Sequence, residues 1–126
     1  MAFLLHQLLS ESASQHPDSP AVLFEEDMIT YGELEKETNR LAHELLKRGI
    51  TKNSRVGIYL NRGIFSVIAA CAVLKSGAVY VPIDPLAPLG RIQYIITPFG
   101  FPVDPEVNKI YAKSESTMFT SVTSFI

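Results

Sequence analysis

Glycines beside apolar runs are the first residues to test for chemistry, because glycine-rich loops bind the phosphates of nucleotides. The dinucleotide-binding pattern G-x-G-x-x-G is absent after the apolar run at 56–60, where Gly57 and Gly63 are isolated. The Walker phosphate loop is absent too, since Lys75 follows Leu74 where that loop requires glycine. The sequence therefore argues against an independent nucleotide-binding protein.

Side chains suited to nucleophilic or metal chemistry are few. Cys71 lies in the apolar run at 64–74, where a small buried thiol is expected, and no serine occupies a G-x-S-x-G elbow. The acidic run at 25–27 has no histidine or second acidic cluster at ligand spacing, which favours an exposed turn over a metal site. Boundary positions are expected for the three histidines, His6, His16 and His43. We therefore assign no catalytic, cofactor-binding or metal-ligating residue.

The most distinctive segment covers residues 74–85, with the sequence Leu74-Lys75-Ser76-Gly77-Ala78-Val79-Tyr80-Val81-Pro82-Ile83-Asp84-Pro85. Gly77 at the end of an apolar helix is free to adopt a positive φ angle, and the apolar run at 78–83 predicts a strand. Asp84 and Pro85 are typical of residues that cap and begin a helix, which we expect to extend to residue 96 with both Pro85 and Pro88 in its first turn.

The residues before this segment complete a βαβ unit. The apolar run at 56–60 predicts a buried strand, and Asn61 is expected to cap a helix that covers 62–76. That helix is apolar on nearly every face, so it requires protein on several sides. The strands on either side of it should be parallel, as in other βαβ units.

The N-terminal part predicts a helix at 4–13, because leucines recur there at helical spacing. Apolar runs at 21–24 and 28–30, separated by the acidic turn, predict a short hairpin. Thr30 and Glu33 match a capping box that begins a second helix, and Gly49 is placed to end it. The charged run at 35–37 is interpreted as the solvated face of this helix.

Composition excludes several classes of protein. The 126 residues predict one domain, and 11 Lys and Arg against 13 Asp and Glu give no reason to expect nucleic acid or an anionic membrane as a partner. A single cysteine cannot form an internal disulfide and fits a reducing compartment. The N-terminus lacks the basic region of a signal peptide, and the longest apolar runs are far short of the roughly 20 residues that span a bilayer. We expect a cytoplasmic protein.

The character of the sequence changes at Thr97. Three prolines, Pro98, Pro102 and Pro105, break any periodicity, and seven of the eleven residues at 114–124 are Ser or Thr. Residues 97–126 are therefore expected to form a divergent loop or disordered tail.

The segment at 74–85 resembles the second core motif of the AMP-forming adenylating enzymes, which include acyl-CoA synthetases, luciferase-like ligases and the adenylation domains of nonribosomal peptide synthetases. Three further segments are similar to family motifs in the same order: Ile29-Thr30-Tyr31-Gly32-Glu33-Leu34, Asn39-Arg40-Leu41-Ala42 and Arg91-Ile92-Gln93-Tyr94-Ile95. The resemblance covers about residues 4–96. It implies an α/β fold in which residues 1–96 form part of the N-terminal subdomain of the ligase fold, with a short hairpin, a βαβ unit with parallel strands and flanking helices.

The resemblance also implies a reaction. Family members make an acyl-adenylate from a carboxylic acid and ATP with Mg²⁺, and commonly pass the acyl group to coenzyme A or a carrier protein. The family's phosphate loop, adenine and ribose contacts, hinge and C-terminal lysine are not found in this sequence. We therefore expect a truncated or frameshifted N-terminal piece that is inactive alone and binds no cofactor itself. The alternative is a non-catalytic interaction module that pairs with a separately encoded remainder or a full-length paralogue.

The truncation has a physical consequence. Parallel strands are normally covered on both faces and paired at both edges, so a cut after the second strand of the βαβ unit leaves unpaired backbone and apolar surface. We expect marginal stability or aggregation of the isolated chain.

Overall fold

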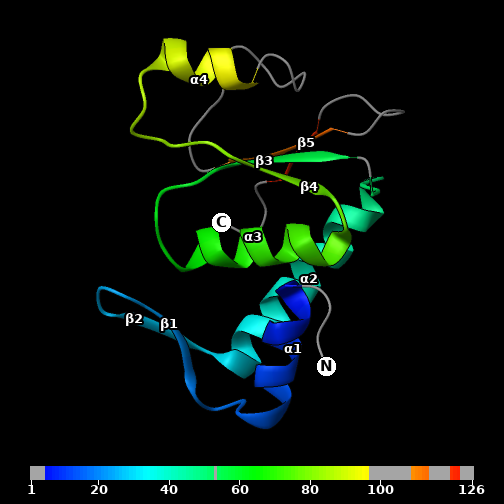
Figure 1. The fold of residues 1–126 in the computed structure, drawn as a ribbon, viewed down its shortest axis with the longest axis vertical. Helices are drawn as coiled ribbons and strands as arrows, with labels where there is room; N and C mark the ends of the chain where they lie inside the picture. Colours follow the sequence, from blue (N-terminus) through cyan, green and yellow to red (C-terminus); the bar gives the residue numbers. More distant parts are fainter. Residues whose placement is uncertain (1–4, 53, 97–108, 114–119, 123–126) are drawn as a thin grey trace.

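The computed structural model describes residues 5–52, 54–96, 109–113 and 120–122. Its elements occur in the order α1 (Leu5–Gln15), β1 (Pro20–Phe24), β2 (Asp27–Thr30), α2 (Tyr31–Lys47), β3 (Arg55–Tyr59), α3 (Ile64–Ser76), β4 (Val79–Pro82), α4 (Leu89–Ile96), β5 (Lys109–Lys113) and β6 (Thr120–Val122). Figure 1 shows the sheet of β3, β4 and β5 between α4 on one face and α3 on the other, with α1 and α2 beyond α3. The expected α/β fold is confirmed.

The first helix and the hairpin lie where the sequence predicts them. β1 and β2 pair antiparallel, with Phe24 opposite Asp27, so Glu25 and Glu26 of the acidic run form the turn between them. Glu25 adopts a positive φ of 54° in that turn. The acidic run is therefore part of the tip of the hairpin.

Two backbone amides at the start of α2 donate to acceptors that precede the helix. The Glu33 amide donates to Thr30 Oγ1 at 3.2 Å, which confirms the predicted N-cap. In a capping box the Glu33 carboxylate would accept from the Thr30 backbone amide. In the structure it accepts from the Thr30 hydroxyl instead, at 3.1 Å. The Gly32 amide donates to the Pro17 carbonyl at 2.9 Å, and a Cβ at Gly32 would lie 3.1 Å from that oxygen. This close approach explains why glycine occupies the second position of the helix.

The third helix begins later than predicted. Its N-cap is Gly63, whereas the sequence interpretation placed a cap at Asn61 and a start at Arg62. Ser66 supports this turn, since its hydroxyl donates to the Gly63 carbonyl at 2.7 Å and accepts from the Gly63 amide at 3.2 Å. The C-terminal end is as predicted, with Gly77 in the left-handed conformation at φ 79°.

The predicted βαβ unit is confirmed. β3 and β4 are parallel, with Arg55 opposite Val79 and Ile58 opposite Pro82. The Ile83 amide donates to the Ile58 carbonyl at 3.0 Å and continues the ladder beyond the strand. α3 connects the two strands and packs against α2, β4, α1 and the hairpin, as its apolar surface requires.

The expectation for residues 97–126 is wrong where the structure describes them. Lys109–Lys113 forms β5, which pairs antiparallel with β3 on the side opposite β4, and Thr120–Val122 forms β6 beside it. β3 therefore has a strand on both sides, and Ile110 and Tyr111 are buried. Residues 97–108, 114–119 and 123–126 lie outside the described residues, so the proposed boundary at residue 96 stays a prediction.

The fourth helix also starts later than predicted. Leu89 is its first residue, so Pro85 lies before the helix and Pro88 immediately precedes it. Asp84 instead closes a short turn, because its Oδ1 accepts from the Leu86 amide at 2.9 Å. The Pro88 carbonyl accepts from the amides of Arg91 and Ile92, both at 3.0 Å.

The sheet separates two apolar clusters, because successive side chains of a strand point to opposite faces. One face of β3, with Val56 and Ile58, packs into the larger cluster with α2 and α3. Tyr59 points to the other face, where it joins a smaller cluster that includes Ile92 of α4. The same alternation places Ile110 of β5 in the larger cluster and Tyr111 in the smaller one.

Adjacent leucines of α2 provide a test of this core. Leu45 is 0% exposed and Leu46 is 49% exposed. We expect Leu45→Ala to lower the free energy of unfolding by about 2–5 kcal/mol, since it opens a cavity in the larger cluster. Leu46→Ala should change it by no more than about 0.5 kcal/mol. Urea denaturation measures both variants, and equal losses would contradict the described orientation of α2.

Candidate functional site

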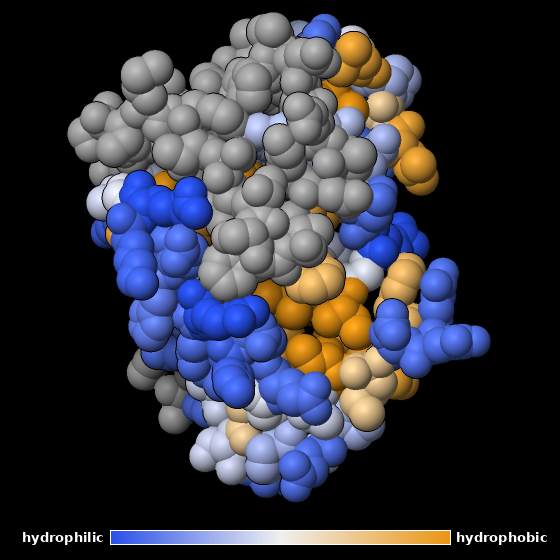
Figure 2. Space-filling model, turned by 180° about the vertical axis from the view of Figure 1, so that it is seen from behind, coloured by the Kyte–Doolittle hydropathy of each residue, from blue (hydrophilic) through white to orange (hydrophobic). Residues whose placement is uncertain are grey.

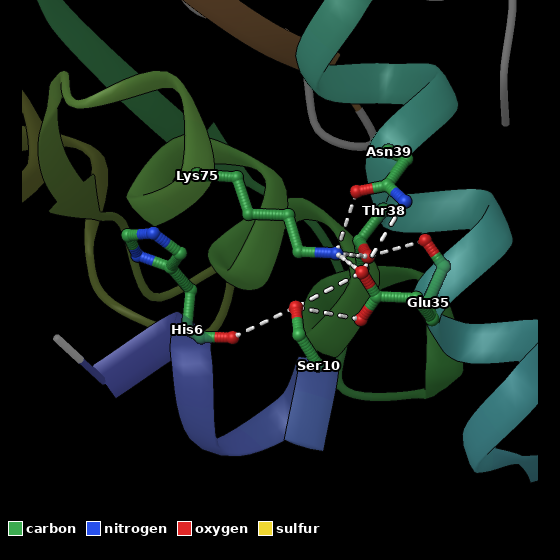
Figure 3. Close-up of polar contacts among 6 residues, drawn as sticks. All are labelled: His6, Ser10, Glu35, Thr38, Asn39 and Lys75. Carbon is green, nitrogen blue, oxygen red and sulfur yellow. Dashed lines mark hydrogen bonds and ion pairs between the residues drawn. The ribbon is translucent and has the colours of Figure 1, made fainter. Parts of the chain in front are cut away.

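The main polar cluster of the described residues surrounds Lys75 at the end of α3 (Figure 3). The Lys75 ammonium lies 2.9 Å from Glu35 Oε1 and donates to Thr38 Oγ1 at 2.7 Å and Asn39 Oδ1 at 2.8 Å. The Lys75 side chain is 8% exposed and that of Glu35 is 23% exposed. All three ammonium protons therefore have acceptors on α2.

The Glu35 carboxylate joins a third helix to this cluster. The Ser10 hydroxyl of α1 lies 3.0 and 3.2 Å from its two oxygens, and Asn39 Nδ2 donates to Oε1 at 3.2 Å. Figure 3 shows the three helices meeting at these side chains, with His6 taking part through its backbone carbonyl. The interpretation of the run at 35–37 as a solvated face is thus wrong for Glu35. We call Ser10, Glu35, Thr38, Asn39 and Lys75 the helix clamp.

The electrostatics of the helix clamp favour the charged carboxylate. Burial acts to raise the pKa of Glu35, but the hydrogen bonds from Lys75, Ser10 and Asn39 and the charge of Lys75 outweigh it and lower that pKa below its ordinary value of 4.5. The two charged groups of the clamp, the Lys75 ammonium and the Glu35 carboxylate, pair with each other. A paired, hydrogen-bonded lysine of this kind holds helices together and has no free position for a reacting group.

The sequence offered two other kinds of candidate, a reactive cysteine and a metal site. Cys71 is half-buried in α3, where burial raises the pKa of its thiol in spite of the nearby charge of Lys75. Cys71 is thus less buried than the sequence predicts, and its raised pKa is unlike that of a reactive cysteine. In the part of the chain that the structure describes, no group of three His, Cys, Asp or Glu side chains is arranged to hold a metal ion.

Two adjoining hollows lie at the carboxyl ends of the parallel strands, where open α/β sheets bind ligands. The first, of about 800 Å³, is bordered by residues that follow β3 and β4 and by α4. The second, of about 450 Å³, lies between the N-terminus of α3 and the hairpin. Both include Leu60, Asn61 and Arg62. We call the two hollows together the carboxyl-end surface.

The second hollow of the carboxyl-end surface is lined mainly by apolar side chains, and the first by apolar and polar side chains together. Phe24, Met28 and Phe65 line the second hollow, and Tyr80, Pro82 and Leu86 line the first. Burial raises the pKa of the Tyr80 hydroxyl. The turn between β3 and α3 has no glycine-rich loop at this surface, because Gly63 is the N-cap and a Cβ there would only contact the Phe24 ring at 3.9 Å. The described residues therefore provide neither a phosphate loop nor a metal site.

A sequence model described as AMP-binding enzyme matches residues 9–101. This match spans the hairpin, the βαβ unit and α4. The chain belongs to the AMP-binding enzyme family.

Relatives of known identity point to one branch of the AMP-binding enzymes. Tyrocidine synthase 1 of Brevibacillus parabrevis is 46% identical over 92 residues, which cover 73% of this chain and 8% of that protein. Surfactin synthase subunit 1 of Bacillus subtilis (strain 168) is 44% identical over 96 residues, which cover 76% of this chain and 3% of that protein. The chain therefore spans a small fraction of the relatives it matches.

Solved structures confirm that the fold is that of the N-terminal part of an adenylation domain. The N-terminal subdomain of NpsA from Klebsiella oxytoca superimposes with a TM-score of 0.72 at 29% identity, covering 77% of this chain and 26% of that chain. An artificially fused adenylation–PCP di-domain NRPS, NpsA-ThdA, superimposes with a TM-score of 0.71, and the match covers 18% of that chain. Among the described residues, every helix falls short of the length and apolar character needed to cross a membrane.

The sequence interpretation missed the helix clamp and the carboxyl-end surface. It examined Lys75 only as part of a phosphate loop, although a lysine inside an apolar helix was itself a signal for a buried acidic partner. Glu35, Thr38 and Asn39 have the i, i+3, i+4 spacing that places side chains on one face of a helix.

The helix clamp predicts a pH-dependent stability. Glu35→Gln should lower the free energy of unfolding at pH 7 by about 1.5–3 kcal/mol, the usual range for a charged hydrogen bond. Because the pKa of Glu35 is lowered on folding, its contribution is present above pH 4.5 and is lost as the pH falls through the folded-state pKa. The deficit of Glu35→Gln relative to the unsubstituted chain should therefore shrink below pH 4.5.

Glu37 provides the matched control on the same helix. It pairs with Arg40 at 2.7 Å, and the Arg40 side chain is largely exposed. Glu37→Gln should change stability by at most about 1 kcal/mol. Denaturation curves at several pH values measure both variants, and a deficit of Glu35→Gln that is constant from pH 7 to pH 3 would contradict the clamp.

Proposed function

We propose that this chain provides the N-terminal scaffold of an ATP-dependent, carboxylate-activating ligase of the peptide-synthetase adenylation type. The observation that supports this most strongly is the 46% identity to tyrocidine synthase 1 over 92 residues. The superposition on an adenylation N-terminal subdomain agrees with it. The completed domain would convert a carboxylic acid and ATP to an acyl-adenylate and pyrophosphate, and pass the acyl group to a thiol.

The role of this chain in that reaction is structural. Its described residues form neither a phosphate loop nor a metal site, so ATP and Mg²⁺ are assigned to the completed domain and not to these residues. The chain alone is proposed to be inactive. Its helix clamp joins α3 to α2, and α3 connects β3 to β4, which pair directly through their backbones.

The thiol acceptor is proposed to be a carrier protein. The NpsA-ThdA structure is described as an adenylation–PCP di-domain, which supports a carrier protein over coenzyme A for relatives of this kind. A cytoplasmic location is proposed on the grounds that the reaction consumes ATP and that the lone thiol, Cys71, needs no oxidising compartment.

The second candidate is a non-catalytic module that pairs with a separately supplied remainder of the domain or with a full-length paralogue. One observation favours it. In the sheet order β4-β3-β5-β6, β4 has a strand on one side only within the described residues. Within the described residues, the other backbone edge of β4 is therefore available for pairing with another chain.

A chimera tests the proposed scaffold function. The 92-residue segment of the tyrocidine synthase 1 adenylation domain is replaced by the matching segment of this chain. We expect amino-acid-dependent ATP–pyrophosphate exchange within about tenfold of the parent domain, since the parent keeps every reacting segment and each factor of ten corresponds to about 1.4 kcal/mol.

The 126-residue chain alone is the negative control and should show no exchange. A chimera carrying Leu45→Asp, which places a charge in the larger apolar cluster, should also be inactive. A soluble chimera that melts cooperatively but lacks exchange activity would show that this chain does not provide an equivalent scaffold. Exchange activity of the isolated chain would overturn the claim that it is inactive alone.

A further inference from the structure

Large apolar side chains are exposed at and near the carboxyl-end surface, as on a surface that binds other protein. Phe65 is 51% exposed and Leu86 is 91% exposed, although both are large apolar side chains. Leu89 and Tyr94 of α4 are also exposed. Figure 2 shows hydrophobic residues in separate groups on the side of the molecule that carries α4 and the hairpin, with hydrophilic residues between them. Large apolar side chains exposed near one another in this way often mark a surface that binds other protein.

The outer face of α2 has the opposite character. Glu37 pairs with Arg40, and Glu44 pairs with Arg48 at 3.1 Å along this helix. Such i, i+3 and i, i+4 pairs are typical of a helix face in contact with water. The outer face of α2 therefore carries paired charges, whereas Phe65 and Leu86 are exposed at the carboxyl-end surface.

The match to the relatives indicates what covers the carboxyl-end surface. This chain covers 24–26% of the solved N-terminal subdomains, so most of such a subdomain lies outside the match and packs somewhere on the matched part. The family match ends at residue 101, just after α4 ends at Ile96. In a relative, the chain therefore continues from α4, which borders the carboxyl-end surface.

We propose that the carboxyl-end surface is the contact face for the remainder of an adenylation N-terminal subdomain. Apolar side chains of the remainder fill the two hollows on either side of Leu60, Asn61 and Arg62. Burial of Phe65, Tyr80 and Leu86 supplies the free energy of association. This inference rests on the proposed function, because it takes the remainder to be of the adenylation type.

Binding in trans tests the contact face. The full 126-residue chain is co-expressed with a tagged tyrocidine synthase 1 adenylation domain that lacks its matching 92-residue segment, and the dissociation constant is measured on the purified partners. We expect a stable one-to-one complex. Phe65→Asp and Leu86→Asp should each weaken it at least tenfold, and neither should unfold the chain, because both side chains are at least half exposed.

Leu46→Asp is the matched control, since Leu46 is 49% exposed but lies on α2. It should change the dissociation constant by less than twofold. Equal effects of all three substitutions, or no complex in co-expression, would overturn the proposed contact face. Sedimentation that shows a dimer of this chain, dissociated by Phe65→Asp and Leu86→Asp, would assign the face to self-association and overturn it as well.

The binding experiment and the chimera separate this inference from the proposed function. Binding that depends on Phe65 and Leu86, together with an inactive chimera, would keep the contact face and remove the scaffold function. An active chimera that tolerates Phe65→Asp and Leu86→Asp without loss of exchange would keep the scaffold function and remove the contact face.

Discussion

The packing of α3 against α2 is the contact on which the rest of the structure depends. Ala69 and Ala72 of α3 are almost completely buried, and their small side chains let the helix lie close to Leu41 and Leu45 of α2. The Lys75 ammonium then joins the end of α3 to α2 through Glu35, Thr38 and Asn39. Gly77 ends α3 shortly after Lys75, and β4 begins at Val79.

A helix that is apolar on every side has consequences for both of its neighbours. α3 packs against α2 on one side and against β3 and β4 on the other, so it transmits the position of the N-terminal helices to the sheet. Its N-terminus, with Gly63 and Ser66, lies beside the carboxyl ends of the strands. The same chain therefore has a well-packed centre and large apolar side chains that its own described residues leave exposed. This combination is expected of one part of a larger domain.

Local signals in the sequence predicted the ends of several elements because those ends depend on a few neighbouring residues. Thr30 caps α2, while Gly49 and Gly77 adopt positive φ angles at or just beyond the ends of their helices. The start of α3 was misplaced because Asn61 and Gly63 both suit a helix start, and only the contacts of Ser66 distinguish them. The motifs at 29–34 and 74–85 identified the family, which the match over 9–101 confirmed.

Features that join distant segments were not predictable in the same way. The pairing of β5 with β3 was missed because the three prolines at 98, 102 and 105 were taken to end regular structure, although Ile110 and Tyr111 alternate between the two faces of the sheet. The partner of Lys75 lies on another helix, so spacing along one segment could not reveal it. The carboxyl-end surface combines residues from the hairpin, α3, β4 and α4, and only the folded chain brings them together.

Amide hydrogen exchange of the full chain, alone and with the remainder of an adenylation subdomain, tests most directly whether this chain is one part of a larger domain. The account predicts that amides of α2, α3 and β3 are protected in the isolated chain, because they lie in the larger cluster. Amides of the turn between β3 and α3, which borders both hollows, should become strongly protected only when the remainder is bound. Equal exchange at this turn in both samples, with a complex present, would contradict the account.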